Sequence, residues 1–189
     1  LQAEQFVSAG VTHFLVETLS SDDGVSELAA WLEEHCPDAF LIASFAVGPD
    51  GFTREGLSGR ALLKRTAALP GVDGVGFNCM SGPHHLLSLV RGLELEGTML
   101  SVMPNAGYPT VLGRRTAYQG TPDYFAQQMA QILRAGASIA GGCCGTTPEH
   151  IARLARLLRE EPAAPAAVVS GPGRAPARAP GGPGRGGGD

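Results

Sequence analysis

The chain has few aromatic residues and few charges: 6% of its 189 residues are Phe, Trp or Tyr, and 17% are Asp, Glu, Lys or Arg. Its 14 basic and 18 acidic residues give a formal net charge of −4, which excludes a strongly basic surface for nucleic acid or anionic membranes. No apolar run approaches the about 20 residues of a membrane-spanning helix. The first ten residues show no secretory signal. We therefore expect a soluble, cytoplasmic protein with no nucleic-acid or membrane partner.

The last segment of the chain, 160–189, differs in composition from the rest. It holds 8 of the 27 glycines, 6 of the 14 prolines and no aromatic residue. Such a segment buries too little apolar surface to offset the entropy lost on ordering. The composition predicts a folded domain over 1–159 and a disordered, low-complexity tail over 160–189.

Before this tail, short apolar runs alternate with helical patterns. Strands are predicted near 14–16, 40–45, 72–77, 99–103 and 138–140, each buried on both faces as in a parallel sheet. Helices are predicted between them, beginning for example after Ser58, at Pro83 and after Thr121, where capping residues and N-terminal prolines stand. Strand followed by helix, about five times over, indicates βαβ units in an α/β protein.

Two parallel architectures fit this pattern, an open doubly wound sheet or part of a (β/α)8 TIM barrel. No glycine-rich GxGxxG turn is present, and the polar residues of interest follow several different strands, which favours the barrel. A full barrel needs about 200 residues or more. We therefore expect the C-terminal part of a barrel, about five βα units, truncated at its N-terminal side.

Three of the four cysteines follow predicted strands. Cys79 ends one strand, and Cys143 and Cys144 end the last one, between Gly142 and Gly145. Parallel strand ends meet at one rim, and the flanking glycines allow the backbone to turn both adjacent sulfurs inward. Three thiolates with an open fourth position are typical of a catalytic zinc site.

Such a site suits alkyl transfer to a thiol. A free thiol has a pKa near 8.5, so only a small fraction is thiolate at neutral pH, and a zinc ion can bind it as the thiolate. Spacing alone leaves a second interpretation open, in which Cys79 is a small buried residue and Cys143–Cys144 is a tight-turn pair, perhaps a redox dithiol.

Three segments resemble the homocysteine S-methyltransferase family. They are VGFNC over 75–79, MPNAG over 103–107 and GGCCGTTPEHI over 141–151. The last is the most specific, and the PNAG stretch is more similar to the folate- and cobalamin-linked branch, which includes methionine synthase, than to the betaine branch. The resemblance covers 1–159, the C-terminal portion of the family's barrel.

The resemblance implies a (β/α)8 barrel with Zn²⁺ held by Cys79, Cys143 and Cys144, and a methyl group moved onto homocysteine to give methionine. The methyl donor is left open among methylcobalamin, methyltetrahydrofolate and a sulfonium compound. The family's N-terminal glycine-rich segment has no counterpart here. A non-catalytic zinc-binding barrel fragment that requires a missing N-terminal part or partner domain, and a dithiol redox protein, therefore remain alternatives.

Three further residues are implied by the same resemblance. Glu17 matches an acidic residue suited to the substrate's ammonium group, and Asn105 stands where a side chain approaches the zinc or fills its open position. Asn78 is expected to support the metal-binding loop from behind.

Other candidates receive simpler interpretations. His84 and His85 are expected to face the surface or pack a helix, and His150 is expected to be a solvated or capping residue. Cys36, before a proline, is expected to be a buried or free thiol. The segment 108–118 is interpreted as a loop, either near a methyl donor or a plain excursion.

Overall fold

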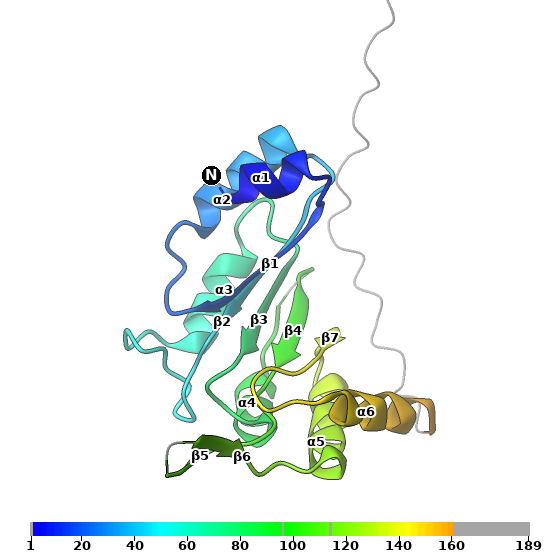
Figure 1. The fold of residues 1–189 in the computed structure, drawn as a ribbon. Helices are drawn as coiled ribbons and strands as arrows, with labels where there is room; N and C mark the ends of the chain where they lie inside the picture. Colours follow the sequence, from blue (N-terminus) through cyan, green and yellow to red (C-terminus); the bar gives the residue numbers. More distant parts are fainter. Residues whose placement is uncertain (1, 96, 114, 161–189) are drawn as a thin grey trace, which may run out of the picture.

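A computed structural model describes residues 2–95, 97–113 and 115–160 of the chain (Figure 1). Five parallel strands form one sheet in the order β1-β2-β3-β4-β7, and β5 and β6 form a separate antiparallel pair. The strands are β1 (His13–Leu19), β2 (Phe40–Phe45), β3 (Gly74–Asn78), β4 (Met99–Met103), β5 (Pro109–Leu112), β6 (Arg115–Tyr118) and β7 (Ile139–Ala140). The helices are α1 (Gln2–Ser8), α2 (Val25–His35), α3 (Gly59–Ala67), α4 (Pro83–Val90), α5 (Pro122–Arg134) and α6 (Pro148–Glu160).

The α/β class and the parallel sheet are confirmed. Each of the five predicted strands lies in the sheet, and a helix follows each of them. Thr121 caps α5 as predicted, because its hydroxyl accepts a hydrogen bond from the Tyr124 N–H at 3.3 Å. Ser58 stands at the N-cap of α3 without a capping side-chain hydrogen bond.

The main core fills the space between one face of the sheet and helices α3 to α6. Every second residue of the central strands points into it, among them Phe45, Phe77 and Val102, which are fully buried. Side chains such as Leu62 and Phe125 meet them from the helices. This packing holds the strands in register, so their carboxyl ends lie along one rim.

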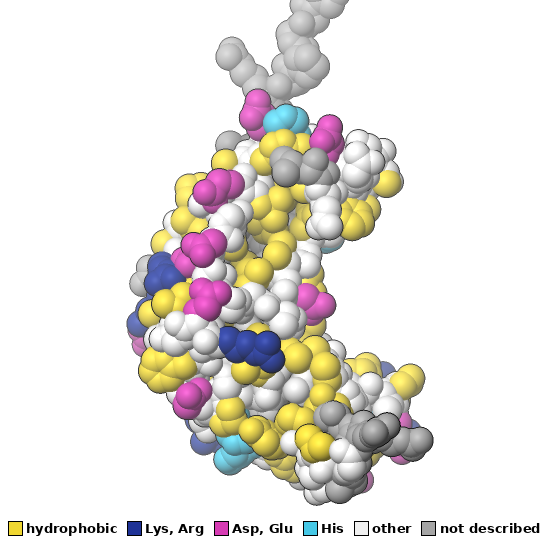
Figure 2. Space-filling view, turned by 60° about the vertical axis from the view of Figure 1, so that its left-hand side comes forward, with side chains coloured by type: hydrophobic (Ala, Val, Ile, Leu, Met, Phe, Trp, Pro, Cys, Tyr) yellow, Lys and Arg dark blue, Asp and Glu magenta, His cyan; other side chains and the backbone are white. Residues whose placement is uncertain are grey.

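The strand β1 was expected to be buried on both faces, and that expectation is wrong. All seven of its residues are at least partly exposed, and Leu15 keeps 44% of its surface accessible. Among the described residues, β1 pairs only with β2, so its second edge is unpaired there. Residues of β1 line an apolar hollow of about 660 Å³ together with Phe6 and Trp31. Figure 2 shows the resulting crescent outline, hollowed on one side.

The segment 108–118, interpreted as a loop, contains a β-hairpin. Pro109–Leu112 pairs with Arg115–Tyr118, and Gly113 adopts a φ of 65° in the turn between them. Two short runs separated by two residues, of which the first is Gly, indicate a β-hairpin. The hairpin follows β4 and lies beyond the arrowheads of the parallel strands (Figure 1), so it adds to the rim that carries the cysteines.

Two further predictions concern the ends and the surroundings of the domain. Within the described residues, no helix combines the length and the apolar character needed to cross a membrane. The predicted tail over 160–189 lies outside the described residues, except for Glu160, which ends α6.

Candidate metal centre

Three thiols meet at the carboxyl rim of the sheet. The Sγ atoms of Cys79 and Cys144 are 3.7 Å apart, those of Cys143 and Cys144 are 3.9 Å apart, and all three lie within 4.8 Å of one another. Cys79 follows β3, the other two follow β7, and β4 lies between those strands. The parallel topology therefore brings together residues that are 65 positions apart in the chain.

An unusual backbone conformation aims Cys79 at the other two sulfurs. Its φ is 57° and that of Met80 is 50°, values in the left-handed region that residues with a Cβ rarely adopt. The Cys79 N–H still donates to the Met103 carbonyl at 3.2 Å, so the residue leaves the sheet immediately after its last ladder bond. Left-handed conformations of this kind cost about 1–2 kcal/mol and collect at functional sites.

The Cys143–Cys144 turn is fastened to the residues that follow β4. The Cys143 N–H donates to the Pro104 carbonyl at 2.7 Å, and the Cys144 N–H donates to Asn105 Oδ1 at 3.1 Å. The Cys144 carbonyl accepts from the Ala106 N–H at 2.9 Å. These bonds turn the chain so that adjacent sulfurs share one side, as the flanking glycines had suggested.

Asn105 is therefore part of the scaffold of the turn. Its side chain is 2% exposed, and its amide oxygen is engaged by the Cys144 backbone. The approach of Asn105 to the metal stays a prediction; the contact that the structure gives its side chain is with the loop that carries two of the thiols.

Glu17 and Asn78 form a second polar group on the same rim. Buried Asn78 accepts from the Thr18 N–H at 2.9 Å, donates to the Thr18 hydroxyl at 2.9 Å and donates to Glu17 Oε2 at 3.3 Å. Thr18 has a φ of 62°, so a third left-handed residue, after Cys79 and Met80, is held in place here. The role of Asn78 in supporting the metal-binding loop stays a prediction. Its amide contacts Glu17 and Thr18, and it directly precedes Cys79 in the chain.

Burial and the neighbouring sulfurs disfavour ionisation of the Cys143 thiol within the cluster. Burial first, and then the charge of Cys79 and a hydrogen bond with it, raise the pKa of the Cys143 thiol to about 12. Burial and a hydrogen bond with Cys144 also raise the pKa of Tyr118 above its ordinary value. A divalent cation among the sulfurs would reverse this penalty, because coordinated thiols are deprotonated.

Tyr118 is a site residue that the sequence analysis left in an undefined loop. It ends β6, and its ring lies on Gly145, where an added Cβ would come within 2.4 Å of the ring. Only a glycine leaves room for this contact next to Cys144. The hairpin pattern over 109–118 is the sequence signal that places Tyr118 at the rim.

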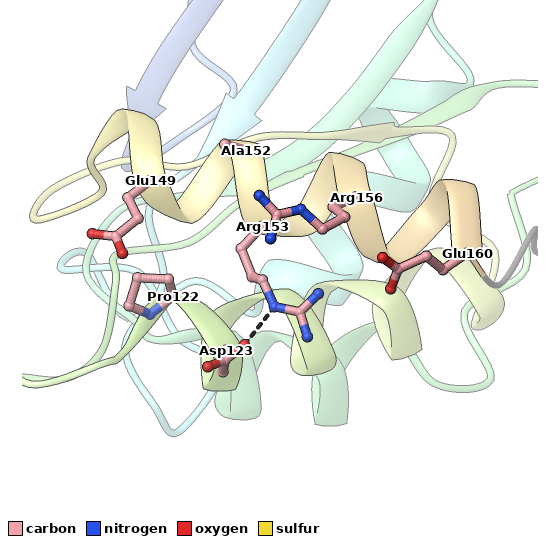
Figure 3. A pocket seen from close by; sticks show the side chains of 7 residues that line it. All are labelled: Pro122, Asp123, Glu149, Ala152, Arg153, Arg156 and Glu160. Atoms are coloured by element: carbon pink, nitrogen blue, oxygen red, sulfur yellow. Dashed lines mark hydrogen bonds and ion pairs between the residues drawn. The ribbon is translucent and has the colours of Figure 1, made fainter.

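A second hollow on the molecule has a different character. About 500 Å³ lies between α5 and α6, lined mainly by charged side chains (Figure 3). Arg153 pairs there with Asp123, an interaction of two surface groups. None of the six predicted site residues lines this hollow, so we assign the site to the thiol cluster.

The sulfur positions fit a tetrahedral zinc ion. Zn–S bonds of about 2.3 Å at tetrahedral angles require S···S distances of about 3.8 Å. Two of the three separations, 3.7 Å for Cys79–Cys144 and 3.9 Å for Cys143–Cys144, match this requirement, and the third lies within 4.8 Å. Cys144 is exposed, so one side of the cluster is open to an incoming ligand.

The fold and the site define an α/β domain with a cysteine cluster at the carboxyl ends of its parallel strands. The homocysteine S-methyltransferase family model matches residues 1–158. This chain belongs to the homocysteine S-methyltransferase family.

Individual relatives match over shorter stretches. Methionine synthase of Mycobacterium leprae is 42% identical over 90 residues, and that of Mycobacterium tuberculosis is 42% identical over 96 residues; these cover 47% and 49% of this chain and 8% of each relative. The Escherichia coli homocysteine methyltransferase MmuM, in its oxidised and metallated forms, aligns with a TM-score of 0.62 and 28% identity. These alignments cover 82% of this chain and 49% and 48% of the two MmuM chains, so this chain spans about half of that solved relative.

Proposed function

We propose that this chain carries the zinc- and homocysteine-binding part of an enzyme that transfers a methyl group to homocysteine and yields methionine. The observation that carries the proposal is the sulfur triangle formed by Cys79, Cys143 and Cys144, with separations suited to a zinc ion. When bound there, Zn²⁺ would act as a Lewis acid that allows a substrate thiol to ionise near neutral pH.

The residues of the chain supply position and charge for this reaction. The homocysteine sulfur would approach the exposed side of Cys144, while the Glu17 carboxylate, oriented by Asn78, would receive the substrate's ammonium group. In the transfer, a bond forms between sulfur and the methyl carbon, and the bond from methyl to the donor breaks. The sulfur proton goes to solvent on ionisation. The donor is a compound with a transferable methyl group, whether methylcobalamin, methyltetrahydrofolate or a sulfonium.

We also propose that the sheet is the C-terminal part of a (β/α)8 barrel. This is supported by the crescent outline (Figure 2), by the unpaired edge of β1 beside an apolar hollow, and by a coverage of about half of the MmuM chain. In a barrel both outer strands, β1 and β7, would pair with further strands. The position of the thiols at the carboxyl ends of the strands is also where barrels carry their active sites.

A titration with zinc tests the metal proposal. We expect about one zinc ion per chain, and homocysteine binding by calorimetry only after zinc is loaded. Glu17→Gln should weaken homocysteine binding at least about ten-fold without changing zinc uptake, since a hydrogen bond to a charged group contributes about 1.5–3 kcal/mol, and about 1.4 kcal/mol is a factor of ten. A chain that takes up no zinc, and whose Cys79 and Cys144 form a disulfide regardless of added zinc, would contradict the proposal and support the redox alternative.

A further inference from the structure

The last helix presents a buried histidine that no part of the proposed chemistry uses. His150 is 6% exposed, and its ring meets the Phe125 ring edge-on with centroids 5.5 Å apart. Its position was expected to be solvated or a helix cap. Capping is one of its roles, but the residue is not solvated.

Both ring nitrogens of His150 have partners of defined polarity. Nδ1 lies 3.2 Å from the Thr147 backbone nitrogen and 2.8 Å from the Thr147 hydroxyl, and Nε2 lies 2.9 Å from the Gly120 carbonyl. A backbone N–H only donates and a carbonyl only accepts. The ring therefore accepts at Nδ1 and donates from Nε2, a single tautomer assigned by its partners.

These bonds connect two segments that hold the thiols. Thr146 closes the turn that starts at Cys143, because its N–H donates to the Cys143 carbonyl at 3.1 Å, and Thr147 is the next residue. Gly120 lies against the Ala106 backbone so tightly that an added Cβ would come within 1.4 Å of the Ala106 oxygen. Ala106 in turn donates to the Cys144 carbonyl. These links form a closed ring around the turn. The chain runs from Cys143 to Thr147, hydrogen bonds join Thr147 to His150 and His150 to Gly120, and Gly120 contacts Ala106, which bonds back to Cys144.

We propose that His150 is a positioning residue for the thiol cluster, which locks the Cys143–Cys144 turn against the segment at Gly120. For metal binding, this inference rests on the proposed function. The start of the turn is held by Pro104 and Asn105, and its end is closed by Thr146. The His150 bonds add a tether from the next residue, Thr147, to the Gly120 carbonyl.

Two substitutions separate this role from helix capping. His150→Asn keeps an acceptor near the Nδ1 position, and hence the cap on Thr147, but is too short to reach Gly120. His150→Gln places an amide donor near the Nε2 position and can retain the bond to Gly120. Zinc affinity by competition with a chelator, the spectrum of the Co²⁺-loaded chain, and thermal unfolding are measured for both variants and for the original chain.

We expect His150→Asn to bind zinc about ten-fold more weakly and to show a changed sulfur-to-cobalt band in the Co²⁺ spectrum. We expect His150→Gln to bind zinc within about two-fold of the original chain. Residues that hold metal ligands in place contribute about 10–100-fold to metal affinity. Equal affinity of all three chains would overturn the proposal. The reverse order would assign the residue to capping alone, and equal loss in both variants would assign it to general stability. Either result also overturns the proposal.

A measurement without metal keeps this inference distinct from the zinc proposal. In a Cys143→Ser background, Cys79 and Cys144 are equilibrated with glutathione, so that two thiols give a disulfide while oxidised glutathione is reduced to two thiols. We expect His150→Asn to lower the fraction of this disulfide at a given glutathione ratio, and His150→Gln to preserve it. If the original chain binds no zinc, the proposed function fails, whereas an unchanged disulfide fraction in His150→Asn refutes the role of His150.

Discussion

Removing one sulfur from the cluster gives the most direct test of the site. Cys79→Ala removes a single sulfur from the cluster. It leaves the steric cost of the left-handed backbone unchanged, because Ala and Cys both carry a Cβ at the φ of 57°. Four-ligand structural zinc sites bind with about 10–16 kcal/mol, an average of about 3 kcal/mol per ligand. At about 1.4 kcal/mol for each factor of ten, the loss of Cys79 should weaken zinc binding at least about 100-fold.

Zinc retained after dialysis against a weak chelator, measured by atomic emission, provides the assay. Cys36→Ala is the matched control, since Cys36 caps the end of α2 and is not part of the thiol cluster. We expect the control to retain zinc like the original chain and Cys79→Ala to lose it, with both remaining folded by circular dichroism. Equal retention by the two variants would refute the sulfur triangle as the metal site, and equal loss would show that any lost thiol has this effect.

Three further perturbations test the rim and the fold. Asn78→Asp should destabilise the chain by about 1–3 kcal/mol in urea unfolding, because it removes a hydrogen-bond donor and places a carboxylate beside Glu17. Adding Glu17→Gln should recover part of this loss, and strictly additive effects of the two substitutions on the unfolding free energy would contradict the contact. Gly120→Ala should cost about 1–3 kcal/mol, since its Cβ would meet the Ala106 carbonyl oxygen at 1.4 Å, and an unchanged unfolding midpoint would refute this close packing. The pKa of Asp22 is lowered chiefly by a hydrogen bond from Arg65 on α3, so the stabilisation by the ionised carboxylate is present above about pH 4 and is lost as the pH falls further. Asp22→Asn should flatten the pH dependence of the unfolding temperature below about pH 4, and an unaltered profile would contradict this stabilisation.

Much of the fold was predictable because its signals are local. The buried run of β3 and the cap of α5 each lie within a few residues of sequence, and both are observed. The meeting of Cys79 with Cys143 and Cys144 was also predictable, since parallel strands place their carboxyl ends on one rim. In contrast, the exposure of β1 depends on whether a neighbouring strand is present, which its own residues do not encode.

The details of the site were less accessible to sequence reasoning. Nothing in the residue type of Cys79 predicts a left-handed backbone, which is uncommon outside glycine. The amide of Asn78 reaches residues on β1, 60 positions away, and His150 bonds to a carbonyl 30 positions away. Such contacts follow from tertiary packing, so the sequence identified the donor atoms but not the bonds that orient them.

The separation of Cys79 from the other two thiols by a whole strand has a consequence for assembly. β4 pairs with β3 on one side and β7 on the other, so the sulfurs meet only when three strands have found their register. An ion coordinated by all three would recognise the finished sheet and not its precursors. Ligands of this kind add about 2.7 kcal/mol at a hundred times their dissociation constant. Ion binding at the rim would therefore report correct folding of this sheet, and a chain with slipped strands would lack the binding site.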